Sequence, residues 1–320
     1  MAGKQDAYPT TRICLPSGLG ICNSEFECVA KATPSYLGPY RLLNVVHTGH
    51  ASQIWQAFDD RNQRMVGVKA VSQKFAKDAE HIGYLRQEYN VGCIIAHPRI
   101  IAVYGFDTDR GIPYLAMEWF SAPNLKRRIR TKEDREKILY LLPKIIEQAA
   151  ESLARMHSLG WVHRDVKPDN FLADDAGEVK LIDFGLAQKV KRGIAKLLSL
   201  GKGKRQGTPS YMSPEQIRCE SLDERADVYS FGCVLYELIV GNPPFTGTKL
   251  DELFQKHLKA TPPALEAADR NLTPEFAQLI KSCLSKDRNG RPGSMEVFLD
   301  DFRKCKVFRI MPRRPAADAS

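Results

Sequence analysis

The sequence lacks a long hydrophobic run. Its longest apolar stretch extends roughly from Phe231 to Val240, and Glu237 interrupts it. A membrane-spanning helix needs about 20 apolar residues in succession, so no span is predicted. The N-terminal segment carries Pro9 and Pro16 among polar groups, where a secretory signal would have an apolar core. We therefore expect a cytoplasmic protein without a membrane span.

Cysteine is also scarce, with eight residues in 320, which excludes a scaffold held together by disulfides. Three of them, Cys14, Cys22 and Cys28, cluster near the N-terminus. Their spacings are wider than the close pairs of a zinc site, so free thiols are favoured over a metal or redox role. The other five are expected to be small buried hydrophobic side chains: Cys93, Cys219, Cys233, Cys283 and Cys305.

The composition is that of a globular protein with an excess of basic residues. The hydrophobic fraction of 43% and the charged fraction of 27% are ordinary, which excludes a fully disordered chain. Lys and Arg number 47 against 38 Asp and Glu, giving a net charge of +9. This balance favours anionic partners such as nucleotides, nucleic acid or acidic protein segments, without choosing among them.

Two regions of different texture follow an N-terminal segment, residues 1–38, that shows little periodicity and is predicted to be a flexible tail. The first region contains short β-rich segments at 41–48, 53–58, 65–71, 100–106 and 113–118, with one helix over 79–95. After a break near residue 120 the pattern is mainly helical, over 134–158, 222–241, 248–259, 273–284 and 294–304. Short strands are predicted at 171–173 and 178–182, and residues 309–320 are expected to be frayed.

Two polar motifs carry the chemistry. The first is His163-Arg164-Asp165-Val166-Lys167-Pro168-Asp169-Asn170, and the second, 13 residues after its end, is Asp183-Phe184-Gly185. Phosphoryl transfer from a nucleotide needs a carboxylate that accepts a hydroxyl proton and a cation for the γ-phosphate. It also needs oxygen ligands for Mg²⁺ across the phosphates. A solvated polar loop is the alternative, and the joint occurrence of both motifs makes it improbable.

On these motifs, residues 40–305 resemble the eukaryotic-like Ser/Thr protein kinase family, of the bacterial type without a transmembrane segment. The resemblance implies an α+β, bilobal kinase fold over residues 39–308. Its N-lobe, 39–119, would hold a five-stranded antiparallel sheet and one helix, and its C-lobe, 120–308, would be mainly helical. It also implies transfer of the ATP γ-phosphate to Ser or Thr hydroxyls of proteins, with Mg²⁺.

The resemblance assigns roles to the catalytic residues. Asp165 would be the catalytic base and Lys167 the partner of the γ-phosphate, while Asn170 and Asp183 would bind Mg²⁺. The hydroxyl of Thr208 would bond near Asp165 and Lys167. Lys69, in Val66-Gly67-Val68-Lys69, would reach the α- and β-phosphates and pair with Glu88. The remaining nucleotide-binding residues would be Val46, Gly49, Ile54, Gly67, Met117, Glu118, Phe120 and Leu172.

A third motif separates protein kinases from small-molecule kinases of the same ancestry, which lack it. It is Gly207-Thr208-Pro209-Ser210-Tyr211-Met212-Ser213-Pro214-Glu215. The resemblance implies that Glu215 pairs with a buried arginine, for which Arg291 fits. It also implies that Asp227 accepts hydrogen bonds from the backbone of the catalytic loop.

The sequence departs from the family at the loop that covers the nucleotide. The expected Gly-x-Gly-x-x-Gly reads His47-Thr48-Gly49-His50-Ala51-Ser52, so one of three glycines remains. Glycines let backbone N–H groups approach phosphates closely, and weakened nucleotide binding is expected. This loop supports the alternative of a pseudokinase, a binding or scaffold module without catalysis. Gly67 is predicted to enlarge the adenine pocket, and Gly92 to loosen the packing behind Glu88.

The segment between the second and third motifs is basic and contains no acidic residue from 184 to 214. An acidic protein substrate or an anionic regulator could bind there, the alternative being a solvated loop; nucleic acid is not expected as a partner. Arg164 precedes the catalytic Asp165, and in the family such an arginine is neutralised by a phosphate on this segment. Ser199 is the hydroxyl in the window where family phosphosites lie, and its phosphorylation is predicted to raise activity.

Overall fold

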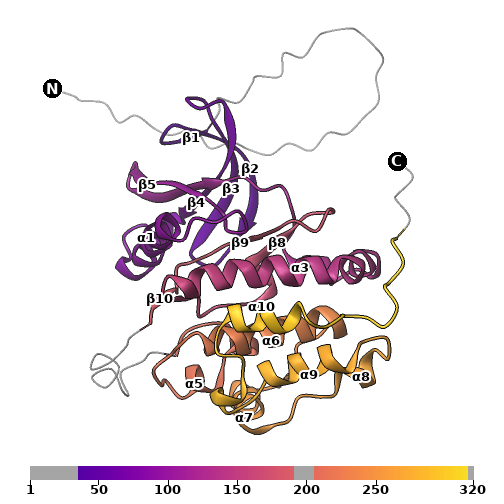
Figure 1. Ribbon diagram of the computed structural model, residues 1–320. Coiled ribbons are helices and arrows are strands. Elements are labelled where there is room, and N and C mark those ends of the chain that lie inside the picture. The colour runs from indigo at the N-terminus through magenta and orange to yellow at the C-terminus, as the bar shows by residue number, and fades with distance from the viewer. Residues whose placement is uncertain (1–34, 191–204, 316–320) are drawn as a thin grey trace, which may run out of the picture. The chain divides into compact units, whose positions relative to one another are not determined.

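The computed structural model describes residues 35–190 and 205–315. These residues belong to one compact unit. The predictions for Cys14, Cys22, Cys28 and Ser199, and for most of the basic segment, lie outside the described residues. The described chain has a β-sheet with one long helix above a larger helical part, as expected for a bilobal kinase (Figure 1).

The N-terminal sheet is antiparallel and has six strands in the order β1-β2-β3-β4-β6-β5. The strands are β1 (Tyr36–Leu37), β2 (Tyr40–Thr48), β3 (Ser52–Asp59), β4 (Arg64–Val71), β5 (Val103–Asp109) and β6 (Ile112–Glu118). The prediction of five strands is therefore short by one. The missed strand, β1, has two residues and lies in the segment predicted to be tail, because two residues are too few to show alternation.

Alternation along β4 places side chains on opposite faces of the sheet. Val66, Val68 and Ala70 belong to one buried cluster, whereas Val71 packs with Leu85 of the helix α1 (Ala79–Ile94). Lys69 shares the face of Val71 and therefore faces α1. Helix α1 begins after Asp78, whose side chain accepts hydrogen bonds from the amides of the first turn.

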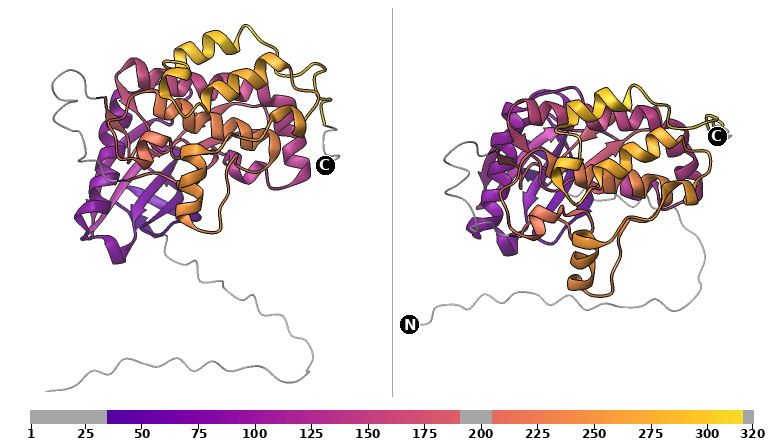
Figure 2. Two further views of the ribbon diagram at one scale, coloured as in Figure 1. Left: turned by 90° about the horizontal axis from the view of Figure 1, so that it is seen from below. Right: turned by 60° about the horizontal axis from the view of Figure 1, so that its bottom comes forward.

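The C-terminal part is built around the long helices α3 (Lys132–Ser158) and α6 (Arg225–Val240). The apolar residues that predict α3 are all buried: Ile138, Leu142, Ile145, Ala149, Leu153 and Met156. Helix α10 (Met295–Phe302) packs along α3, and α9 (Pro274–Cys283) packs on α6 (Figures 1 and 2). The other helices are α2 (Leu125–Arg128), α5 (Pro214–Ile217), α7 (Leu250–Lys259) and α8 (Leu265–Ala268).

Short elements flank the loops that carry the two polar motifs. The strands β7 (Trp161–Val162) and β10 (Gln188–Lys189) pair with each other, as do β8 (Phe171–Ala173) and β9 (Val179–Leu181). Single 3-10 turns cover Gln73–Phe75, Pro168–Asn170, Pro209–Tyr211 and Arg288–Gly290. In the part of the chain that the structure describes, no helix has the length and apolarity required to cross a bilayer.

Two predictions from the sequence need correction. Cys93 is exposed rather than buried, because it lies on the face of α1 opposite Val91, and Cys219 and Cys305 are only half-buried; Cys233 and Cys283 are buried as predicted. Arg309 and Ile310, predicted to be frayed, are hydrogen-bonded to Asn271: the Arg309 amide donates to its backbone oxygen and the Ile310 amide to its side chain.

A buried ion pair stabilises the loop that ends in Glu215. Arg291 donates to both carboxylate oxygens of Glu215, at 2.7 and 3.0 Å, which confirms the predicted pairing. Both side chains are almost fully buried. Arg291 also donates to the backbone oxygens of Ser285 and Arg225, so its charge is well solvated by the protein.

Removal of Arg291 should therefore be costly. We expect Arg291→Ala to lower the free energy of unfolding by about 3–5 kcal/mol, because Glu215 would stay buried without a counter-charge. Urea unfolding measures this. Arg303→Ala is the control, since Arg303 is half-exposed and its pairs with Glu147 and Glu151 lie at the surface; it should cost less than about 1 kcal/mol. Equal losses in the two variants would contradict the prediction.

Candidate active site

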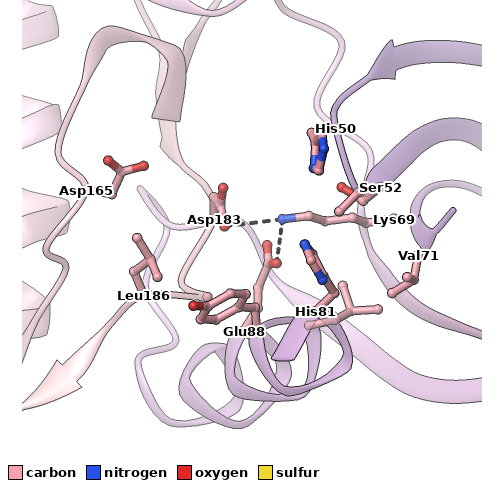
Figure 3. A pocket seen from close by; sticks show the side chains of 13 residues that line it. His50, Ser52, Lys69, Val71, His81, Glu88, Asp165, Asp183 and Leu186 are labelled. Atoms are coloured by element: carbon pink, nitrogen blue, oxygen red, sulfur yellow. Dashed lines mark hydrogen bonds and ion pairs between the residues drawn. The ribbon is translucent and has the colours of Figure 1, made fainter. Parts of the chain in front are cut away.

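Three charged side chains meet between the sheet, α1 and the loop after β9. Lys69 Nζ donates to Glu88 Oε2 at 2.6 Å and to Asp183 Oδ1 at 3.2 Å (Figure 3). The pairing of Lys69 with Glu88 confirms the prediction. Glu88 is almost fully buried, whereas the Asp183 side chain is 42% exposed at the edge of the pocket.

One ammonium group therefore serves two carboxylates, and the pKa values diverge. Burial opposes ionisation of Asp183, yet the charge of Lys69 lowers the pKa of that carboxyl to about 2. Burial raises the pKa of Glu88 to about 7, against the opposing effect of Lys69. Burial alone would lower the pKa of Lys69, but the two carboxylates raise it, so its ammonium stays charged. The deeper carboxyl holds its proton more tightly because one positive charge cannot compensate both acids.

A second cluster surrounds Asp165 on the opposite side of the pocket (Figure 3). Asp165 Oδ1 accepts from both the amide and the hydroxyl of Thr208, each at 2.8 Å. Lys167 Nζ donates to Asp165 Oδ2 at 2.5 Å and to Thr208 Oγ1 at 3.0 Å. The three residues predicted to be catalytic thus form one hydrogen-bonded group, although Thr208 comes from a distant segment.

Buried Asp227 of α6 holds the backbone of this loop. Its carboxylate accepts from the amides of His163 and Arg164, at 2.6 and 2.9 Å. This confirms the predicted contact. His157 Nε2 lies 3.0 Å from the same carboxylate. Burial opposes ionisation of Asp227, but the hydrogen bond from His157 and the amides lowers its pKa. Arg164 has a φ of 70°, a left-handed conformation that the two amide bonds help to hold.

The predicted Mg²⁺ ligands have the chemistry for a hard cation. Asn170 Nδ2 donates to the backbone oxygen of Asp165 at 2.8 Å, which orients the side-chain amide and leaves its oxygen for a ligand. The low pKa of Asp183 keeps its carboxylate ionised at neutral pH. Amide and carboxylate oxygens are the donors that Mg²⁺ prefers, so these residues fit the cation.

The pocket between the clusters, about 330 Å³, is also lined by residues for which no role was predicted. His81, Tyr84 and Leu85 line it together with Glu88 (Figure 3 labels His81 and Glu88). Their spacing of three, four and seven residues places them on one face of α1. This helical spacing is the sequence signal that could have predicted their place beside Glu88. His50, from the loop between β2 and β3, lines the pocket as well, and its ring packs on Phe75 with centroids 5.0 Å apart.

The residues predicted to bind adenine lie on the strands and connection next to this pocket. Ile54 is opposite Lys69 in the β3–β4 register; Ile54 and Phe120 pack against the main core, to which Met117 belongs. The Glu118 side chain pairs with Lys180 at 2.8 Å, and the Glu118 amide donates to Ala102 O at 2.8 Å, so neither group is free for a ligand. Val46 on β2 is 54% exposed, and Leu172 on β8 is half-buried. Their binding of nucleotide stays a prediction.

Two glycines create less free space than the sequence suggests. A Cβ at Gly67 would lie 3.2 Å from Met117 Cγ, so that side chain already fills the position. At Gly92 a Cβ would come within 2.8 Å of the Val103 methyl groups. Val103 thus packs directly on α1, and the predicted loosening behind Glu88 is wrong. Both glycines are close-packing positions, where a side chain would need movement of its neighbour.

Comparison with known proteins agrees with this geometry. The family model for the protein kinase domain matches residues 40–302. The chain is 34% identical to the serine/threonine-protein kinase PknA of Mycobacterium tuberculosis over 281 residues, covering 86% of this chain and 63% of that protein. It is 34% identical to PknB of the same organism over 273 residues, covering 81% and 42%.

A probable serine/threonine-protein kinase of Streptomyces coelicolor is 32% identical over 274 residues, covering 84% of this chain and 40% of that protein. The chain thus spans between two-fifths and about two-thirds of the length of these relatives. The chain belongs to the protein kinase domain family.

The charge arrangement at Lys69 predicts an unusual pH dependence. The folded protein should hold the Glu88 proton up to about pH 7, against an ordinary pKa of 4.5. The folded state then binds more protons than the unfolded state, so stability decreases as pH rises through this window. Relative to Glu88→Gln, the wild type should lose on the order of 2 kcal/mol of unfolding free energy between about pH 5 and about pH 8.

Urea unfolding of both nucleotide-free proteins across that range measures the difference. Glu147→Gln, a change at an exposed carboxylate, is the control and should show no such trend. A wild type that gains stability over Glu88→Gln with rising pH would mean that the ion pair outweighs burial, contrary to the prediction.

Proposed function

We propose that this chain is an ATP- and Mg²⁺-dependent protein kinase that phosphorylates Ser or Thr hydroxyls of proteins. The observation that supports this most is the convergence of two charged clusters on one pocket. Lys69, Glu88 and Asp183 form one, and Asp165, Lys167 and Thr208 form the other. The relatives named as serine/threonine-protein kinases support the same reaction.

Each residue has a role that its contacts allow. Asp165 has both oxygens fixed by Thr208 and Lys167, so it is oriented to accept the proton of a substrate hydroxyl. Lys167, adjacent to that carboxylate, would neutralise charge on the transferred phosphoryl group. Lys69, charged and held by Glu88, would bind the remaining phosphates.

Asn170 and Asp183 would hold Mg²⁺, which supplies charge neutralisation at the phosphates. Two protein side chains are fewer than the oxygens that Mg²⁺ takes, which suits a cation that also binds nucleotide phosphates. Acidic substrate proteins and cytoplasmic residence are further predictions from the sequence. The described end of the basic segment, with Lys189 and Arg205, agrees with the first of these.

Asp165→Asn tests the catalytic assignment. We expect a decrease in kcat of about 10²- to 10⁴-fold, because proton acceptance is lost in the transition state. The affinity for ATP should change little, since that interaction is not made in the ground state. Transfer of radiolabel from ATP to casein measures the first quantity and calorimetry the second. Lys69→Met should also abolish transfer.

Asp107→Asn is the matched control, an exposed carboxylate on β5 that should leave turnover unchanged. Turnover of Asp165→Asn at the wild-type rate would refute the assignment.

The reduced glycine content of the nucleotide loop supports one alternative, a pseudokinase. Binding of ATP by the wild type with no transfer above that of Asp165→Asn would favour it.

The nucleotide loop gives a separate test. Gly49 donates its amide to Ser52 O at 2.9 Å, and the exposed His47 borders it. Restoring two glycines, with His47→Gly and Ser52→Gly together, should tighten ATP binding severalfold because the backbone can approach the phosphates more closely. Calorimetric titration in Mg²⁺ measures the affinity.

Asn62→Gly with Gln63→Gly, in the turn between β3 and β4, is the control with the same two glycines. It should leave the affinity unchanged. Weaker binding after the change at residues 47 and 52 would mean that the native side chains contact the phosphates favourably.

A further inference from the structure

A chain of hydrogen bonds connects α1 to the catalytic loop through the end of the basic segment. Arg164 Nη2 donates to Gln206 Oε1 at 3.0 Å. Gln206 Nε2 in turn donates to the hydroxyl of Tyr84 at 3.0 Å, and Tyr84 donates to Glu80 at 2.7 Å. The amide of Gln206 thus uses its acceptor toward the catalytic loop and its donor toward α1, a polarity that a side-chain amide supplies.

The two residues that Gln206 joins, Tyr84 and Arg164, each lie close to a residue of the proposed catalytic machinery. Tyr84 precedes Glu88 by one helical turn and lies on the same face of α1. A bond that fixes the Tyr84 hydroxyl therefore also restrains the position of Glu88. Arg164 is adjacent to Asp165, and its backbone amide is held by Asp227. Gln206 therefore joins the helix that presents Glu88 to the loop that presents Asp165.

The backbone at Gln206 is itself fixed. Gln216 Nε2 donates to Arg164 O at 2.8 Å and to Gln206 O at 3.3 Å. Gly207 has a φ of 117°, and a Cβ there would lie 2.9 Å from Arg164 O. This close approach, which requires glycine, keeps the Gln206 side chain in reach of both partners.

The charge at Arg164 gives the link its significance. Among residues 35–190 and 205–315, no carboxylate forms an ion pair with the Arg164 guanidinium, which donates to Gln206 Oε1 and, at 3.5 Å, to the backbone oxygen of Leu186. Burial lowers the pKa of Arg164, consistent with a charge that is only partly compensated. A guanidinium in a basic surrounding would ordinarily attract an anion. Here a neutral amide holds it in place.

We propose that Gln206 is a positioning residue that holds α1 and the catalytic loop together through Tyr84 and Arg164, so that Glu88 and Asp165 are aligned without a phosphate group at Arg164. The inference rests on the proposed kinase function. It differs from the sequence-based hypothesis for Ser199, because the link that it names needs no modified side chain.

The test uses the full chain produced together with a phosphatase and shown by mass spectrometry to carry no phosphate. With casein as acceptor, this protein should be active, and Gln206→Ala should lower kcat about tenfold or more, as expected for loss of a hydrogen bond to a charged group. Gln206→Glu, which keeps an acceptor for Arg164 but loses the donor to Tyr84, should lower kcat to about the same extent as Tyr84→Phe.

A double-mutant cycle separates the link from a general packing effect. Tyr84→Phe should lower kcat, and combined with Gln206→Ala it should add little further loss, because both changes break one chain of bonds. Tyr89→Phe is the matched control, since it removes a hydroxyl from the same helix that faces Cys93 instead of the catalytic loop. Additive losses for Tyr84→Phe and Gln206→Ala, or a Gln206→Ala protein as active as the wild type, would overturn the inference.

Hydrogen exchange supplies a readout that does not depend on catalysis. Gln206→Ala should speed exchange of the amides over 79–94 relative to the wild type, with an unchanged melting temperature, whereas Tyr89→Phe should not. If no variant transfers phosphate but this difference is present, the proposed function fails and the positioning role stands. A wild type that is active only after phosphorylation, with exchange over 79–94 unaffected by Gln206→Ala, would refute the positioning role alone.

Discussion

The carboxylate of Asp227 is the interaction on which the active site depends. It is fully buried in α6 and accepts two backbone amides of the catalytic loop, together with a bond to His157. A buried carboxylate without such donors would be costly, and the loop without it would leave two amides unpaired. The buried carboxylate and the two loop amides therefore stabilise each other, which explains why a loop with a left-handed Arg164 keeps one conformation.

From this anchor the site extends outward through side-chain amides and hydroxyls. Asn170 donates a hydrogen bond to the backbone carbonyl of Asp165, and Thr208 donates one to the Asp165 carboxylate. Gln216 donates to the backbone carbonyl of Arg164. These bonds connect segments that are far apart in the sequence, and each satisfies a polar group that the fold removes from water. The Asp165 carboxylate is thus oriented from several directions without a ligand, which is the condition for preorganised catalysis under the proposed function.

The sequence predicted the parts of this arrangement that short motifs encode, and it missed those that depend on packing. The long helix α3 followed from its apolar period, and the pairs Lys69–Glu88 and Glu215–Arg291 followed from the family resemblance. The contact of Gly92 with Val103, 11 residues away, has no local signal. Neither does the bond between Gln206 and Tyr84, which joins residues 122 positions apart. Long-range neighbours of this kind are set by the packing of lobes and loops, which periodicity does not contain.

The charges in the pocket complete the argument about what it can bind. Lys69 is shared between Glu88 and Asp183, and the more exposed Asp183 carries the lower pKa, so its carboxylate is the ionised acid at the open side of the nucleotide-free cluster. A ligand with phosphates alone would meet Asp183 as a like charge, which disfavours it. Cations at Asp183 remove that repulsion and leave the ammonium of Lys69 to Glu88 and to phosphate oxygens. Under the proposed function, this charge arrangement favours a nucleotide bound together with a divalent metal over the free nucleotide.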